Sequence, residues 1–192
     1  MDKYQNKYRI TSARWQDWDY AWDGVYFITI CTKNREHYFG EIVDDKMVLS
    51  NTETIAHILW YEVKNHAKNI ELDEFVVMPN HIHGILILHG NDRNNGDNGN
   101  NEETRHVFSL QHGNDLSLGQ KRFQNKGKNT ISSIVGSYKS AVTKHCNRLG
   151  FDFKWQPRFH DHIIRDDKSY LQIQDYIRNN PQNWDKDKFY GE

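Results

Sequence analysis

Two histidines separated by a single residue are the sharpest local feature of this sequence. They lie in the segment 78–84 (MPNHIHG), directly after a Pro-Asn pair that is typical of a turn. In a strand, side chains at positions i and i+2 point to the same face, roughly 6–7 Å apart along the backbone. Two imidazoles in that arrangement, His81 and His83, can converge on one divalent ion. Two hydrogen-bonded or exposed histidines would explain the pattern as well, so both interpretations stay open at this point.

A second candidate lies near the C-terminus, in the segment 175–181 (DYIRNNP). Tyr176 and Asn180 are four residues apart, so they share one face of the helix expected to end before Pro181. If that face met the strand with the histidines, a phenol, an amide oxygen and two imidazoles would share one pocket. The alternative is that Tyr176, between Ile173 and Ile177, is simply a core aromatic residue.

A third candidate is the segment 155–165 (WQPRFHDHIIR), in which arginines alternate with aromatic residues. Guanidinium groups bind phosphates and rings stack on bases, so Trp155, Arg158 and Arg165 suit contact with a single-stranded nucleic acid. A polar strand edge is an equally good explanation.

Local charge adds to this third candidate. The whole chain is nearly neutral, with 25 Lys and Arg against 26 Asp and Glu. Between Lys121 and Lys168, however, eleven basic residues, among them Lys139 and Lys144, stand against four acidic ones, a net charge of +7. This asymmetry favours contact between the C-terminal part and a polyanion, although an ordinary solvated surface would also fit.

Length and composition limit the class of protein. A chain of 192 residues with 25 aromatic side chains can bury one substantial core, so full disorder is excluded. No run of about 18 apolar residues or signal-peptide core is present, so we expect no membrane association. The two cysteines, Cys31 and Cys146, form no disulfide framework, which favours a cytoplasmic protein.

Periodicity predicts an α+β fold, a mainly antiparallel sheet with helices on one face. We expect a single domain over 1–192, with an N-terminal arm (1–23) and a flexible, Asn- and Gly-rich insertion (about 90–128). The predicted strands are 25–32, 71–78, 81–88 and 159–164, with a hairpin at 41–49. The predicted helices run from a cap at Asn51 or Thr52 to about Lys68, over 130–149, and from a cap at Asp166 or Asp167 to Pro181.

Five blocks in this order form a recognisable set: YFITICT, MPNHIHGI, SYKSAVT, WQPRFHDHIIRD and DYIRNNP. Over residues 20–184 the sequence resembles the REP-associated and related single-tyrosine transposases, whose signature is His-hydrophobic-His (HUH) followed by a distant helical tyrosine. The resemblance implies a ferredoxin-like sheet. It also implies that His81, His83 and Asn180 bind Mg²⁺ or Mn²⁺ and that Tyr176 is the nucleophile.

The resemblance further implies nicking and strand transfer of single-stranded or hairpin DNA through a 5′-phosphotyrosine intermediate. The expected DNA contacts are Arg158, Arg165, Lys139, Lys144 and Trp155. Two other functions stay open: a hairpin-binding module that does not cleave, and a metal-dependent phosphoesterase that uses water as its nucleophile. A homodimer is also left open, because the sequence does not choose an oligomeric state.

Overall fold

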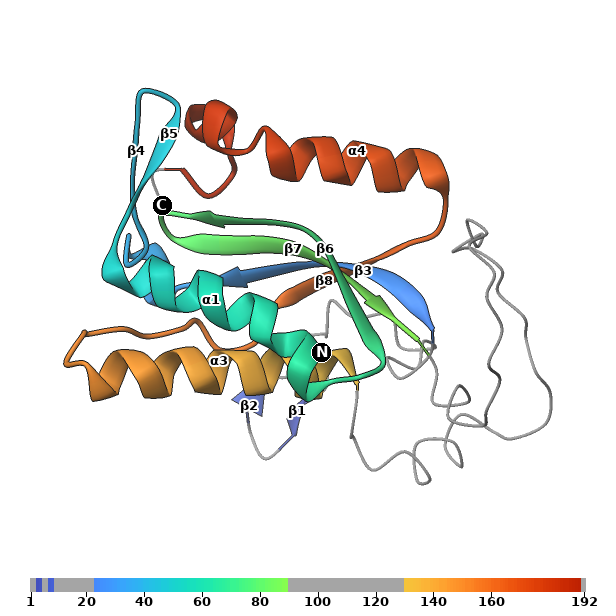
Figure 1. The fold of residues 1–192 in the computed structure, drawn as a ribbon, viewed down its shortest axis with the longest axis horizontal. Coiled ribbons are helices and arrows are strands. Elements are labelled where there is room, and N and C mark those ends of the chain that lie inside the picture. The colour runs from blue at the N-terminus through green and yellow to red at the C-terminus, as the bar shows by residue number, and fades with distance from the viewer. Residues whose placement is uncertain (1–2, 5–6, 9–22, 90–129, 191–192) are drawn as a thin grey trace.

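The protein is seen in a computed structural model that describes residues 3–4, 7–8, 23–89 and 130–190 (Figure 1). The predicted insertion (90–128) lies outside the described residues. So does the predicted N-terminal arm (1–23), apart from residue 23 and the two-residue strands β1 (Lys3–Tyr4) and β2 (Lys7–Tyr8). No helix in the described ranges has both the length and the apolar character needed to cross a bilayer.

A four-stranded antiparallel sheet is the centre of the fold, in the order β6-β7-β3-β8. Its strands are β3 (Gly24–Cys31), β6 (Ile70–Met78), β7 (His81–Leu88) and β8 (His160–Ile164), close to the predicted ranges. After β3 comes the short helix η1 (Lys33–Arg35), then the predicted hairpin, β4 (Gly40–Val43) and β5 (Lys46–Leu49). Asp44 and Asp45 both have positive φ at its turn, as a tight hairpin turn requires.

Local capping signals start the three α-helices. Ser50 caps α1 (Asn51–His66), so this cap lies one residue before the predicted one. Thr130 caps α3 (Ile131–Arg148) and Asp166 caps α4 (Asp167–Arg178). Pro181 does not simply end the last helix, since it begins the short helix η3 (Pro181–Lys186).

The helices occupy both faces of the sheet (Figure 1). The helices α1 and α3 lie together on one face, as predicted, and α4 lies on the other. The expectation that all helices cover one face is therefore wrong for α4. The physical reason is that the second face is also apolar: Val25, Ile85 and Ile164 form a separate buried cluster with Ile177 of α4.

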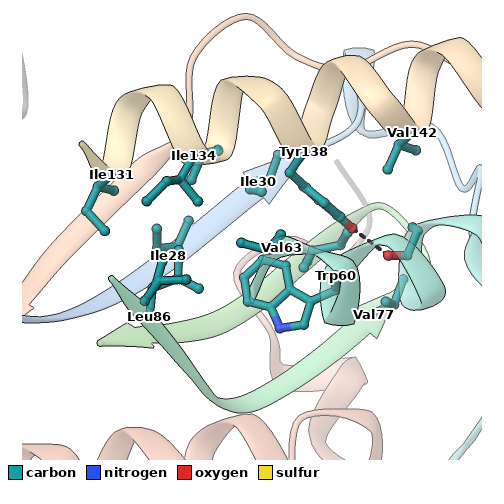
Figure 2. Packing of buried hydrophobic residues seen from close by; sticks show 14 of the residues in the cluster. Ile28, Ile30, Trp60, Val63, Val77, Leu86, Ile131, Ile134, Tyr138 and Val142 are labelled. Atoms are coloured by element: carbon teal, nitrogen blue, oxygen red, sulfur yellow. Dashed lines mark hydrogen bonds between the residues drawn. The ribbon is translucent and has the colours of Figure 1, made fainter. Parts of the chain in front are cut away.

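The larger core lies between the sheet and the pair α1–α3 (Figure 2). The Trp60 ring is fully buried, and the Tyr138 hydroxyl donates a 2.9 Å hydrogen bond to the carbonyl of Ala56. A Cβ atom on Gly84 would come within 2.4 Å of the Trp60 ring. Strand β7 can therefore pack against α1 only because residue 84 has no side chain.

The helix α4 is held over β6 by polar contacts as well as by its apolar side. The register of β6 is irregular between Leu72 and Phe75, and Asp73 and Glu74 in this irregular stretch bond to α4. The hydrogen bonds to Asp73 come from the Tyr170 hydroxyl and from the Gln174 amide. The Arg178 guanidinium pairs with Glu74 at 2.6 Å. These contacts fix the helix that carries Tyr176.

Candidate active site

The two histidines of the HxH motif lie side by side on the α4 face of the sheet. His81 and His83 are 0% and 1% exposed, and their ring centroids are 4.4 Å apart. Their register partners on β3 are Cys31 and Thr29, whose side chains share that face. The predicted alternation along the strand is thus observed, with Ile82 and Leu86 on the opposite face in the main core.

Hydrogen bonds orient both imidazoles. The Asn80 amide donates from Nδ2 to the Phe189 carbonyl, so its Oδ1 atom faces Nδ1 of His81 at 2.9 Å. An amide oxygen only accepts, so this network assigns the proton of His81 to Nδ1 and leaves a lone pair on Nε2. On His83, Nδ1 lies 2.9 Å from the Thr29 hydroxyl. Metal-binding histidines are held in this way, through the nitrogen that does not ligate.

Two buried polar atoms of the site have unused hydrogen-bonding capacity. His81 Nε2 is buried and has no hydrogen-bond partner among the described residues, and the same holds for Asn180 Oδ1. A buried polar atom without a partner costs free energy, so it indicates a missing ligand or a functional constraint. Both atoms are electron-pair donors, the kind of group that a metal ion would satisfy.

Burial keeps both histidines neutral. It lowers the pKa of His83 to about 3 and lowers the pKa of His81 well below its usual range, the neighbouring His83 adding to the second effect. Protons therefore do not compete for these nitrogens at neutral pH, which is the state a metal requires.

Asp187, in the segment after η3, adds a carboxylate to this group. Its Oδ2 atom accepts hydrogen bonds from the Tyr176 hydroxyl and from Nδ2 of Asn180, both at 2.9 Å. One ligand atom from each of His81, His83 and Asp187 lies within 4.8 Å of the others. Two imidazoles, a carboxylate and an amide oxygen suit a divalent cation, but such a donor set does not choose between Mg²⁺, Mn²⁺ and neighbouring transition metals.

Tyr176 projects from α4 to this group of donors. Its hydroxyl lies 3.1 Å from His83 Nε2, while 40% of the residue remains exposed. Burial of the hydroxyl, followed by the Asp187 carboxylate, raises the pKa of Tyr176 above its usual range. The side chain is thus partly exposed while its hydroxyl stays protonated, so the hydroxyl becomes a nucleophile only when its proton is removed.

The residues expected to contact DNA fall in different places. The Lys139 amine on α3 donates 2.8 Å hydrogen bonds to the carbonyls of Gln156 and Arg158, and the Trp155 indole donates to the Lys139 carbonyl. Lys139 and Trp155 therefore hold the turn that presents the exposed Arg158. Lys144 is exposed on α3, and Arg165 follows the far end of β8, away from that turn. The DNA contacts of all five residues stay predictions.

Sequence reasoning missed three residues of the site. Asp187 lies in a polar stretch (185–188, DKDK) with no spacing signal that separates it from a surface residue. Thr29 carried a weak signal, since it is a hydroxyl in an otherwise apolar strand and is 4% exposed. The Pro79-Asn80 pair indicates only a turn in the sequence, yet Asn80 is fully buried and orients His81.

Comparison with solved structures identifies the architecture. The chain resembles the structure described as the REP-associated tyrosine transposase bound to a REP hairpin, with a TM-score of 0.53 and 22% sequence identity over 96% of this chain and 74% of that one. At this level of identity the likeness concerns the fold.

A sequence relative identifies the family. The chain is 36% identical over 181 residues to an uncharacterized protein of Haemophilus influenzae strain Rd, covering 93% of this chain and 92% of the relative. The protein therefore belongs to the same family as that Haemophilus protein. No family model matches the sequence.

Proposed function

We propose that this protein nicks single-stranded DNA and transfers the strand with Tyr176 as the nucleophile, assisted by a divalent metal ion. The single observation that carries the proposal is the position of the Tyr176 hydroxyl, 3.1 Å from His83 Nε2 and 2.9 Å from Asp187 Oδ2, two members of the possible metal-binding group. A tyrosine that only fills the core would not combine a 40% exposed side chain with a hydroxyl held by a buried imidazole and a carboxylate.

The topology supports the same proposal. The order strand-helix-strand-strand-helix-strand, with strand order β6-β7-β3-β8, corresponds to a ferredoxin-like sheet, and α4 is an addition on the second face. In this arrangement the HxH strand is central and the tyrosine helix crosses above it. This arrangement supports the proposal, because the HUH architecture implied by the sequence resemblance requires a tyrosine helix close to the histidine strand.

The donor set fits a divalent cation. We propose that His81, His83 and Asn180 hold Mg²⁺ or Mn²⁺ through Nε2, Nε2 and Oδ1, with the Asp187 carboxylate in the same group. When bound, such an ion would neutralise a non-bridging phosphate oxygen and orient the phosphate for attack.

The side chains can perform the remaining steps. The Tyr176 oxygen would attack the phosphorus and form a bond to the 5′ phosphate. The bond from phosphorus to the 3′ oxygen breaks, and that oxygen takes up a proton from solvent to leave as a 3′-hydroxyl. Asp187, which already accepts the phenolic hydrogen bond, is the nearest carboxylate to receive the proton. Because the phosphotyrosine bond conserves the energy of the linkage, a DNA 3′-hydroxyl can reverse the step on a new strand without ATP.

The substrate class comes from the fold neighbour, which was determined with a REP hairpin. We therefore propose single-stranded DNA containing an imperfect hairpin as the substrate of this chain. The +7 segment between Lys121 and Lys168 supports a polyanionic partner.

The test is incubation of the protein with end-labelled hairpin oligonucleotides and Mn²⁺, followed by denaturing electrophoresis. Wild-type protein should form a covalent adduct, and Tyr176→Phe should form none while it binds the DNA within a few-fold. Tyr61→Phe is the matched control, since Tyr61 is an exposed tyrosine of α1 on the other side of the sheet, and it should form the adduct.

Two outcomes would contradict the proposal. Cleavage that persists in Tyr176→Phe without an adduct would indicate a phosphoesterase that uses water. Hairpin binding without cleavage by the wild-type protein would indicate a binding module.

A further inference from the structure

A second pair of alternating histidines lies on the same face of the sheet as the HxH motif. In β8, His160 pairs with Thr29 and His162 pairs with Phe27. Those two residues of β3 pair on their other side with His83 and Ile85. Because residues paired across a sheet point to the same face, His160 continues the row that begins at His83.

The spacing of this row suits a nucleic acid strand. Neighbouring strands lie about 4.8 Å apart, so the backbone of His160 stands about 10 Å from that of His83, across β3. This is close enough for one DNA strand to reach both positions. The residue between His83 and His160 in this row is the buried Thr29. In the next row Phe27 pairs with His162; its ring is partly exposed, and its centroid lies 5.1 Å from the His83 ring and 6.1 Å from the Tyr176 ring.

The described helices cover only one end of this half of the face. Helix α4 makes most of its contacts with β6 and β7, with Asp73 and Glu74 of β6 holding it, and it also buries Ile164 at the end of β8. On β8, His160 and His162 are both exposed, whereas Ile163, on the opposite face, is partly buried against the main core. Two exposed histidines on an edge strand, next to a partly exposed phenylalanine, form a shelf that begins at the candidate active site.

The chemistry of the shelf matches one occupant. Imidazole N–H groups donate hydrogen bonds to phosphate oxygens, and imidazole and phenyl rings stack on unpaired bases. Arg158 precedes the pair and Arg165 follows it, so a positive charge lies at each end. A protein partner would instead require an apolar or paired edge, which these residues do not provide.

We propose that His160, His162 and Phe27 bind the single-stranded DNA that adjoins the scissile phosphate. This inference rests on the proposed function, since the scissile phosphate is defined by Tyr176 and the histidines of β7. In this proposal β8 binds the unpaired DNA, whereas the histidines of β7 bind the metal and Tyr176 attacks the phosphate.

The experiment measures binding without chemistry, in the Tyr176→Phe background and in EDTA. The probe is fluorescein-labelled oligo(dT) of 20 nucleotides, because stacking tolerates any base and this probe has no hairpin. The double variant His160→Ala/His162→Ala should bind it roughly tenfold more weakly or worse, the size expected for the loss of one stacked base. Phe27→Leu, which keeps an apolar side chain, should weaken binding by a smaller factor.

Two matched readouts separate this role from a structural one. The control variant His66→Ala/His145→Ala removes two exposed histidines from α1 and α3, on the other side of the sheet, and should bind oligo(dT) like the parent. Mn²⁺ affinity by calorimetry, measured without EDTA, should be unchanged in His160→Ala/His162→Ala.

The outcomes are distinct. Unchanged oligo(dT) affinity in the β8 double variant, with a parent that binds, would overturn the shelf and leave the proposed function standing. Loss of Mn²⁺ binding in that variant would also overturn it, by assigning the two histidines to the metal site. A parent that binds neither oligo(dT) nor hairpin DNA would overturn the proposed function itself.

Discussion

The two faces of strand β7 have the same burial and opposite chemistry. Ile82 and Leu86 point to α1 and α3 and lie in the main core, while His81 and His83, one residue away, point to α4. All four are at most 1% exposed. Both sides bury a polar atom that has no hydrogen-bond partner among the described residues, Trp60 Nε1 on the core side and His81 Nε2 on the other. Only the α4 side, however, brings two imidazoles, a carboxylate and a phenol together. Neither burial nor a single unpartnered atom therefore separates a structural face from a functional one, but the convergence of several polar groups does.

The largest expected effect on stability comes from the core face. Ile82→Ala should lower the free energy of unfolding by roughly 2–5 kcal/mol, because it removes a fully buried side chain from a packed core. Mn²⁺ should still raise its unfolding midpoint, since a ligand of the folded state stabilises by mass action. His83→Ala should lose that rise. Thermal unfolding of each variant with Mn²⁺ or with EDTA measures this difference. If Mn²⁺ still raised the unfolding midpoint of His83→Ala, the two faces of β7 would not differ in metal binding.

Lowering the pH should destabilise the protein through His81 and His83, the two histidines on the α4 face of β7. The pKa of each histidine is lower in the folded protein than the usual unfolded value of about 6.5, so the unfolded chain binds more protons below that pH. Stability is thus fully present above about pH 6.5 and is lost as pH falls towards the folded pKa, by up to about 1.4 kcal/mol per pH unit for each histidine.

Urea unfolding in EDTA between pH 5 and 7 measures this slope. His83→Gln cannot titrate and should remove about half of the slope. If stability changed with pH equally in the parent and in His83→Gln, the imidazole of His83 would not be held neutral.

Two glycines differ in the space around them, and alanine substitutions should therefore have opposite effects on stability. Gly84→Ala should lower the free energy of unfolding by roughly 1–3 kcal/mol, because the new Cβ would overlap the buried Trp60 ring. Gly136→Ala should instead raise it by roughly 0.5–1 kcal/mol, since that position lies inside α3 with no atom within 4 Å and alanine favours the helix. Denaturant unfolding midpoints measure whether each variant is less or more stable than the parent. If both variants changed stability in the same direction, the packing argument would be wrong.

The smallest expected effect concerns Lys139, whose amine is hydrogen-bonded, in comparison with the exposed Lys144. Lys139→Met should cost at most about 1 kcal/mol, because two hydrogen bonds from a partly solvated amine to the 156–158 turn are lost. Lys144→Met, one helical turn later and exposed, should leave stability unchanged. If both variants unfold at the same denaturant concentration, Lys139 does not brace the turn and is as free for DNA as Lys144.

Much of the fold could be predicted from the sequence because its signals are local. The turn at Pro79-Asn80 followed by an apolar run predicted β7 with its observed bounds. Helical spacing predicted α3, and a capping aspartate followed by Pro181 predicted α4, each to within a few residues. Capping was harder, since Ser50, Asn51 and Thr52 are all good N-caps and only the backbone shows that Ser50 accepts the hydrogen bond from Glu53.

What the sequence by itself determined is therefore the elements and the residue types that could do chemistry: the i, i+2 spacing of the histidines and the i, i+4 spacing of Tyr176 and Asn180. Only the tertiary structure decided that these pairs meet, because contact between residues 83 and 176 depends on which face of the sheet receives α4. Both faces of β3 and β7 are apolar, so periodicity could not choose. Asp187 is the clearest case: its sequence context is that of a surface residue, and only the path of the chain after η3 brings its carboxylate to the phenol and the histidines.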